Sequence, residues 1–135
     1  MARNQGVRRL GGVYPNVPLE GGQVVEPGDL LMRNKTTGMW RKAADLSGYV
    51  GGGMSRNLAD TRLLKDGEGS TSVDHGELYV NDSLKGKPVG SIGAKVYVED
   101  EGHVAGSGNV LMGIVVDRGN GELVVLVDSA VLLVG

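Results

Sequence analysis

The sequence predicts an all-β protein, and two observations support that prediction. Apolar runs rich in β-branched residues, at 110–117 and 122–128, flank an Asn120-Gly121 pair, and Asn-Gly between such runs is the strongest short hairpin signal. Glycine supplies 24 of the 135 residues, against a usual share of about 7%. These glycines separate short apolar runs, as expected of a chain with many tight turns.

Neither of these two runs alternates between apolar and polar residues. A strand with one solvated face should alternate, so we expect both strands to be buried on two faces. That arrangement is typical of a small closed barrel or of a surface covered by a partner subunit. A further apolar segment, 130–134, lies near the C-terminus. Because Phe is absent and Trp occurs once, the core must be built from Val, Leu, Ile, Met and Ala. The predicted fold is a small β-barrel or β-tulip domain.

The other elements follow from short patterns along the chain. A proline-glycine turn at 27–29 and a polar turn at 34–38 separate early strands. The spacing of Leu58, Ala59, Arg62 and Leu63 fits a short helix within 54–64. A polar loop follows at 65–74. Further strands are expected at 23–26, 30–33, 39–43, 77–80, 94–100 and 103–105.

Residues 1–22 differ from the rest and are expected to form an extended N-terminal arm, leaving 23–135 as one β-domain. The arm is rich in Gly and Pro and has no acid before Glu20. The glycines and prolines interrupt any helical or strand periodicity of apolar residues. It is either a disordered terminus or an arm that orders on a partner. In the second case the candidate partner-binding residues are Arg3, Arg8, Arg9, Val13, Tyr14, Val17 and Leu19.

Composition excludes several classes of function. There are no cysteines, so disulfides, Cys-ligated zinc and thiol chemistry are excluded. A net charge of -2 gives no global basic field for nucleic acid. No apolar stretch approaches the 18 or so residues of a membrane span, and the N-terminus does not look like a signal peptide. We therefore expect no nucleic-acid or membrane partner, and synthesis in a bacterial or viral cytoplasm.

No motif predicts catalysis, a cofactor or a metal. The two histidines, His75 and His103, each have acids nearby in sequence, but a metal site needs three or four converging ligands. The serines lie in predicted turns and there is no Gly-x-Ser-x-Gly elbow. Gly106-Ser107-Gly108-Asn109 lacks the third glycine of a dinucleotide fingerprint. The acidic 117–122 turn lacks the spacing of a calcium-binding EF-hand loop.

The order of several short strings resembles the capsid cement, or head decoration, proteins of tailed bacteriophages. The resemblance covers about residues 23–128. Its strings are Val25-Glu26-Pro27-Gly28-Asp29-Leu30, Gly76-Glu77-Leu78-Tyr79-Val80, Ile92-Gly93-Ala94-Lys95-Val96-Tyr97-Val98 and Gly113-Ile114-Val115-Val116-Asp117. It implies a β-barrel or β-tulip domain, usually trimeric, that docks on the outside of an expanded capsid. The long arm and the polar, Gly-rich 54–75 insertion depart from a compact member of that family.

These observations lead us to expect a non-enzymatic structural protein of a phage head. Its expected partners are the major capsid protein and further copies of itself in a homotrimer, and its expected location is the outer surface of the virion. Two alternatives remain. One is a β-barrel module that binds carbohydrate or a host surface, although Trp40 and the four tyrosines are dispersed. The other is a small oligomeric phage hydrolase with its acids at subunit junctions, which would require clustered Asp, Glu or His with perturbed pKa values.

Overall fold

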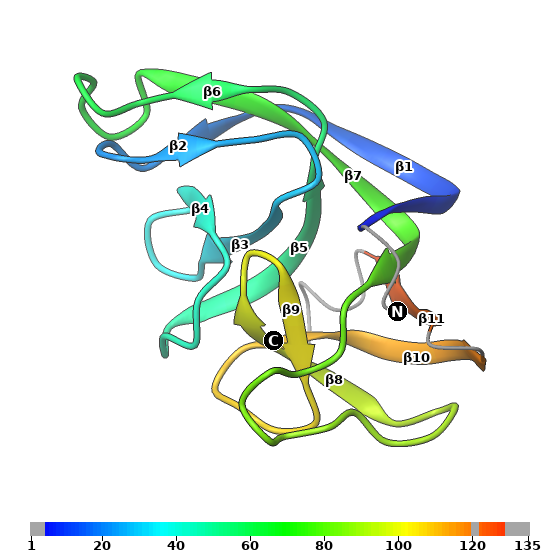
Figure 1. Ribbon diagram of the computed structural model, residues 1–135. Coiled ribbons are helices and arrows are strands. Elements are labelled where there is room, and N and C mark those ends of the chain that lie inside the picture. Colours follow the sequence, from blue (N-terminus) through cyan, green and yellow to red (C-terminus); the bar gives the residue numbers. More distant parts are fainter. Residues whose placement is uncertain (1–4, 120–121, 129–135) are drawn as a thin grey trace.

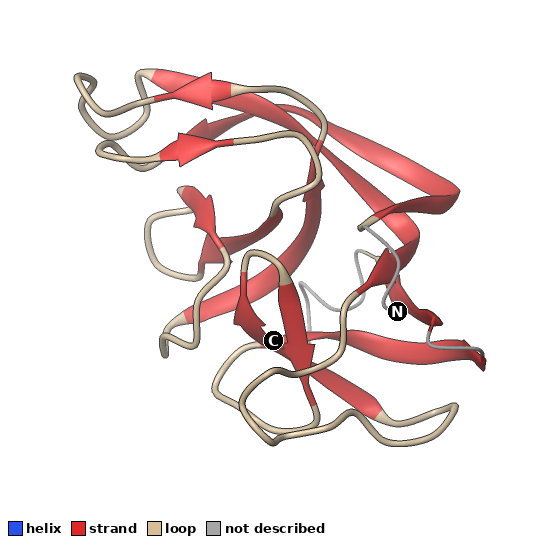
Figure 2. Cartoon of the chain, in the orientation of Figure 1, coloured by secondary structure: helices blue, strands red, loops and turns tan. Residues whose placement is uncertain are grey.

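The computed structural model describes residues 5–119 and 122–128, and this part of the chain is all-β (Figures 1 and 2). It contains eleven strands and no helix, which confirms the predicted fold class. No helix is therefore available among the described residues to span a membrane. The strands are β1 (Gly6–Leu19), β2 (Val24–Val25), β3 (Leu30–Asn34), β4 (Trp40–Lys42), β5 (Tyr49–Ser55), β6 (Ala59–Asp60), β7 (Gly69–Val80), β8 (Lys95–Asp100), β9 (His103–Ala105), β10 (Leu111–Gly119) and β11 (Glu122–Val127).

One large sheet contains nine of these strands, in the order β1-β4-β3-β5-β7-β11-β10-β8-β9. An additional pairing joins β1 to β7, so the sheet curls into a partial ring. The β1–β4 side of that ring has a single pair of residues, Leu19 and Trp40. Strands β2 and β6 form a separate two-stranded ribbon, at the top of Figure 1.

The segment expected to be an arm is instead the longest strand of the sheet. β1 runs antiparallel to β7 from Gly6–Tyr79 to Leu19–Gly69, with register shifts at three places. This corrects the expectation that no strand would survive among the glycines and prolines of residues 1–22. The register shifts allow glycines within the strand pair. At one of them Gly76 has φ +131°, and a side chain there would meet the backbone of β1.

Two hydrophobic clusters lie on opposite faces of β3. Leu30 and Met32 belong to the larger cluster, whereas Leu31 between them belongs to the smaller one with Trp40. Successive side chains of a strand point to opposite faces, so an apolar run without alternation is what two-sided burial requires. The larger cluster draws on β5, β7, β8, β10 and β11, and the smaller one on β1, β2, β4 and β7.

The three glycines of β5 let that strand pass close to both clusters. A Cβ on Gly51 would lie 2.8 Å from Met112 Cα, and a Cβ on Gly52 would lie 2.0 Å from Trp40 Cζ3. Those separations are too short for real Cβ atoms. Gly53 adds a positive φ of +147° beside the backbone of Asp74. The Gly-Gly-Gly run is therefore a packing requirement on two sides.

The predicted C-terminal hairpin is confirmed in its strands. β10 and β11 pair antiparallel from Ile114–Leu126 to Gly119–Glu122, whereas the turn at Asn120-Gly121 and the 130–134 segment lie outside the described residues. Two-sided burial holds for Leu123, Val124 and Val125, each at most 4% exposed, but it is wrong for Ile114, which is 45% exposed.

The helix predicted within 54–64 is wrong. β5 ends at Ser55, and Ala59–Asp60 pair with β2 as the second strand of the ribbon. Asn57 accepts hydrogen bonds from Ser55 and Thr71 through its backbone oxygen, and Thr61 bonds to the backbone of Gln23 in both directions. The hydrogen bonds of Asn57 with Thr71 and of Thr61 with Gln23 join distant parts of the sequence, and they outweigh the weak helical spacing.

Candidate functional site

The two residues predicted as apolar anchors at the end of the arm are used by the chain's own core. Val17 is 7% exposed and Leu19 is fully buried, both in the smaller cluster. In this conformation neither offers surface to a partner, which corrects their assignment as partner-binding residues. Val13 and Tyr14 are half-buried on β1, and Arg3 lies outside the described residues.

Tyr14 lies in a row of three aromatic rings. Its ring centroid is 4.5 Å from that of His75, in a stacked geometry, and 5.7 Å from that of Trp40. The hydroxyl of Tyr14 and Nδ1 of His75 are buried without a hydrogen-bond partner among the described residues. Burial, with a smaller effect from Asp128, raises the pKa of the Tyr14 hydroxyl. Trp40 is the buried member of this row, whereas Tyr14 and His75 are half-buried.

Arg8 is held by two acids from other strands. Its Nε donates to Glu77 Oε1 over 3.1 Å, and its Nη1 donates to Asp117 Oδ2. These contacts fasten β1 to β7 and β10. Arg9 is exposed on β1, beside Glu77 in the register. Of the basic residues predicted to bind a partner, Arg8 is thus already paired inside the molecule.

Replacing Arg8 with alanine should raise the pKa of Asp117. The Arg8 hydrogen bond is the main cause that holds that pKa below its usual range. A depressed folded-state pKa contributes stability above the ordinary value of about 3.9, and that contribution is lost as pH falls through the folded value. Carboxyl NMR titration measures the change. Asp60 is an internal control, because Arg62 holds its pKa at about 2 independently of Arg8; an equal rise at Asp60 would contradict the assignment.

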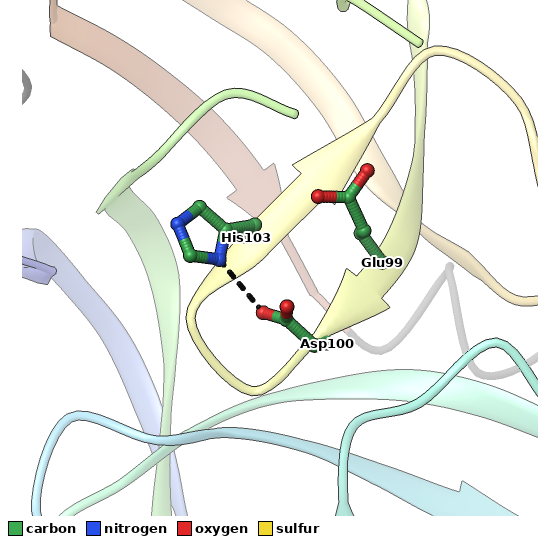
Figure 3. A group of neighbouring side chains, drawn as sticks. All are labelled: Glu99, Asp100 and His103. Atoms are coloured by element: carbon green, nitrogen blue, oxygen red, sulfur yellow. Dashed lines mark hydrogen bonds and ion pairs between the residues drawn. The ribbon is translucent and has the colours of Figure 1, made fainter. Parts of the chain in front are cut away.

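Polar side chains gather around the β8–β9 hairpin, in the group drawn in Figure 3. Candidate ligand atoms of Glu99, Asp100 and His103 all lie within 4.8 Å of one another. The types are those that bind divalent metals. Hydrogen bonds within the chain already engage them: His103 Nδ1 lies 2.9 Å from Asp100 Oδ1, which also accepts from Gly102 N.

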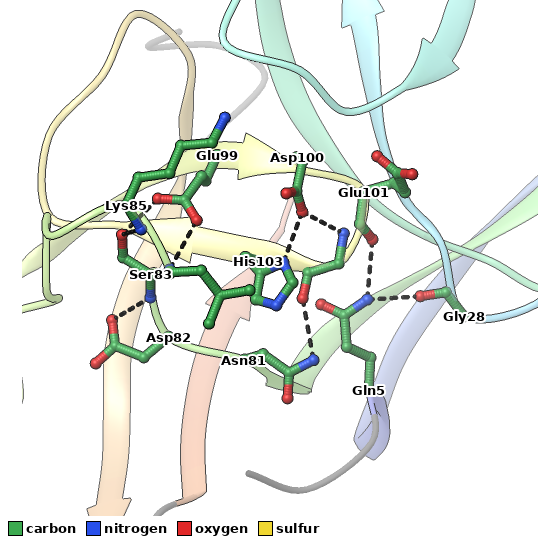
Figure 4. A network of polar contacts seen from close by, with 12 residues as sticks. Gln5, Gly28, Asn81, Asp82, Ser83, Lys85, Glu99, Asp100, Glu101 and His103 are labelled. Carbon is green, nitrogen blue, oxygen red and sulfur yellow. Dashed lines mark hydrogen bonds and ion pairs between the residues drawn. The ribbon is translucent and has the colours of Figure 1, made fainter.

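Glu99 is the buried member of this group, 6% exposed. One of its carboxylate oxygens accepts from the Ser83 hydroxyl and the other from the backbone N–H of Leu84, 2.9 Å away (Figure 4). A buried charge needs such partners. The Ser83 hydroxyl thus faces a carboxylate, and among the described residues no hydrogen bond joins it to His103. This differs from the hydroxyl–histidine pair of a serine hydrolase.

The contacts of Glu99 help to pin the segment between β7 and β8, which we call the 81–94 loop. Asp82 Oδ1 accepts from the N–H groups of Ser83 and Val89. Arg118 donates to the carbonyls of Val89 and Gly90 and forms an ion pair with Asp82 over 2.9 Å. Asn81 donates to Gly102 O. A long connection without strands is therefore tied to β8, β9 and β10.

This pinned loop presents apolar and basic side chains to solvent. Leu84 is 77% exposed and Ile92 is 63% exposed, and Lys85 and Lys87 are exposed between them. The sequence-based prediction of partner-binding residues did not include them. A signal was present: the segment 83–95 contains three lysines and no acid.

Comparisons of the chain with protein-family models, curated proteins and solved structures found no match.

Replacing Ser83 with alanine should loosen the 81–94 loop without unfolding the protein. The change leaves one oxygen of the buried Glu99 without its hydroxyl partner, at an expected cost of about 1–3 kcal/mol. Amide hydrogen exchange at Leu84 should become faster, and the thermal midpoint should fall. Ser91→Ala is the matched control, because Ser91 is an exposed residue of the same loop. Equal exchange at Leu84 in both variants would contradict the fastening role.

Proposed function

We propose that the protein is a structural head decoration, or capsid cement, protein that binds the outer surface of an expanded phage capsid. It acts without catalysis, as a homotrimer on the major capsid protein. It is made in the host cytoplasm and takes up no nucleic acid or membrane. The sequence resemblance motivates this proposal, and the placement of exposed apolar side chains supports it.

The observation that carries the proposal is that large apolar side chains protrude from two distant loops. Leu58, Leu63 and Leu64 are 66%, 99% and 40% exposed in the connection between β5 and β7, while Leu84 and Ile92 protrude from the 81–94 loop. Figure 1 places these two loops at opposite ends of the molecule. A domain with a filled core and apolar tips at both ends suits a bridge between neighbouring subunits.

Bridging would stabilise a shell by multivalency. A trimer that contacts several capsomers makes each later contact intramolecular, which can raise the overall affinity by about 10²–10⁴ without new types of contact. Binding to the assembled shell but not to free subunits stabilises the shell by mass action. Protection should therefore increase with the free concentration of the protein.

The test is to heat expanded heads with and without the added protein and to measure genome release. We expect release at a higher temperature with the protein, equally in the presence of a chelator. The variant His75→Asn with His103→Asn, checked first for folding by thermal melting, should protect nearly as well. Absence of protection would overturn the proposal, and protection abolished by chelator would point to a metal-dependent mechanism.

The oligomeric state on the particle is a separate expected outcome. Electron microscopy of decorated heads should show three contacting copies at each site, because the head decoration proteins that the sequence resembles are usually trimers. Isolated, non-contacting monomers on the particle would contradict the trimer. Monomers in dilute solution would not, since association depends on concentration.

A further inference from the structure

The 81–94 loop and the start of β8 carry positive charge that no ion pair with a described residue neutralises. Lys85, Lys87 and Lys95 are exposed, and none of them forms an ion pair within the described residues. The nearby acids are already engaged: Asp82 with Arg118, and Glu99 with Ser83 and Leu84. In Figure 4 the Lys85 side chain extends past Glu99 toward solvent.

Apolar side chains accompany these lysines. Leu84 precedes Lys85 in the loop, Ile92 lies near its end, and Ile114 of β10 pairs directly with Lys95 of β8. We call this set the lysine face: Leu84, Lys85, Lys87, Ile92, Lys95 and Ile114. A partner that complements it must offer acids together with apolar contacts.

The connection between β5 and β7 carries less of this charge, because Lys65 is its one basic residue without an ion pair among the described residues. Arg62 forms an ion pair with Asp60 and Arg56 with Asp74, and Arg8 of β1 is paired as described above. Among the described residues, the lysine face therefore gathers three lysines without an ion pair, whereas on the N-terminal strand only Arg9 lacks one.

The lysine face is also held in one shape. The hydrogen bonds of Glu99, Asp82 and Arg118 to the loop fix its backbone at Leu84, Val89 and Gly90. A loop that is ordered before binding loses less conformational entropy in the complex. This favours a partner of defined shape, a folded protein surface, over a fluid lipid headgroup layer.

We propose that the lysine face is the surface that docks on the capsid shell, and that its partner is an acidic protein surface with apolar recesses for Leu84 and Ile92. The inference rests on the proposed function and names the contact through which it operates. The basic groups are lysines without an aromatic neighbour in the loop, whereas single-stranded nucleic acid is usually held by aromatic stacking.

The test compares two double variants of the full chain on expanded heads that lack the protein. Lys85→Glu with Lys87→Glu reverses charge at the lysine face, and Lys35→Glu with Lys42→Glu makes the same change at lysines of the β3–β4 hairpin. We expect the first to weaken binding at least about tenfold at low salt and the second to change it little. Melting curves of both variants establish that they fold.

A second measurement uses the isolated, ¹⁵N-labelled protein and a defined probe, the peptide acetyl-Glu-Leu-Glu-Glu-Leu-Glu-amide. We expect amide shifts confined to residues 83–95 and 114, and none with the Lys-for-Glu version of the peptide. Wild-type protein that fails to bind heads overturns the proposed function, whereas equal binding by both double variants overturns only the lysine face. Shifts at 83–95 produced by phosphatidylserine vesicles or duplex DNA, and not by the peptide, would also overturn it.

Discussion

Replacing Gly52 with alanine should destabilise the protein by about 3 kcal/mol, a large part of the 5–15 kcal/mol typical of a domain. The added Cβ would lie 2.0 and 2.3 Å from two atoms of the Trp40 indole. That ring is 4% exposed and packed in the smaller cluster, so it cannot move away without opening the core. Chemical denaturation, followed by the single tryptophan's fluorescence, measures the loss.

Gly119→Ala is the matched control, because a Cβ there meets nothing within 4 Å. A double-mutant cycle with Trp40→Leu tests the cause directly, with unfolding of all four proteins followed by circular dichroism because Trp40 is the single tryptophan. Leucine lacks the ring atoms in question, so the added cost of Gly52→Ala should be much smaller in that background. An unchanged midpoint for Gly52→Ala in the wild-type background would mean that β5 does not pass against the indole.

Deleting residues 1–20 should prevent stable folding, contrary to the sequence-based expectation that the β-domain would remain intact. The deletion removes the fully buried Leu19 and nearly buried Val17 from the core and leaves one edge of β7 unpaired along the β1 register. An exposed edge of that length also promotes aggregation. Circular dichroism and size-exclusion chromatography of the truncated chain measure the outcome.

A pair of point substitutions distinguishes the loss of core packing from the effect of shortening the chain. Leu19→Ala should cost about 2–5 kcal/mol, whereas Leu10→Ala on the same strand should cost less than about 0.5 kcal/mol, because Leu10 is 50% exposed. A truncated protein that melts like the full chain would show that β1 is an accessory strand after all.

The sequence was most informative where strands are local neighbours. The β10–β11 hairpin and the alternation of Val96 and Val98, both buried, follow from period and turn residues alone. β1 could not be predicted in the same way, because its regularity depends on partner residues that lie 50 to 73 positions away in the sequence. Its glycines and prolines are tolerated only because bulges in the β1–β7 register accommodate them.

The candidate site was even less predictable from sequence. The role of Glu99 depends on Ser83 and Leu84, which reach it from the preceding loop, and Arg118 reaches the same loop from another strand. None of these contacts is encoded by spacing. The unpaired lysines were visible in the sequence, but their lack of acidic partners was not.

The pairing of the first strand with the seventh has a consequence for synthesis. β1 leaves the ribosome before β7, which begins at Gly69. At about 5–20 residues per second, the N-terminal strand waits roughly 3–10 s for its partner. During that time its apolar residues have no sheet to join. Its arginines and prolines, residues that protect an edge strand from unwanted pairing, would keep the nascent chain from binding strands of neighbouring copies before its own β7 arrives.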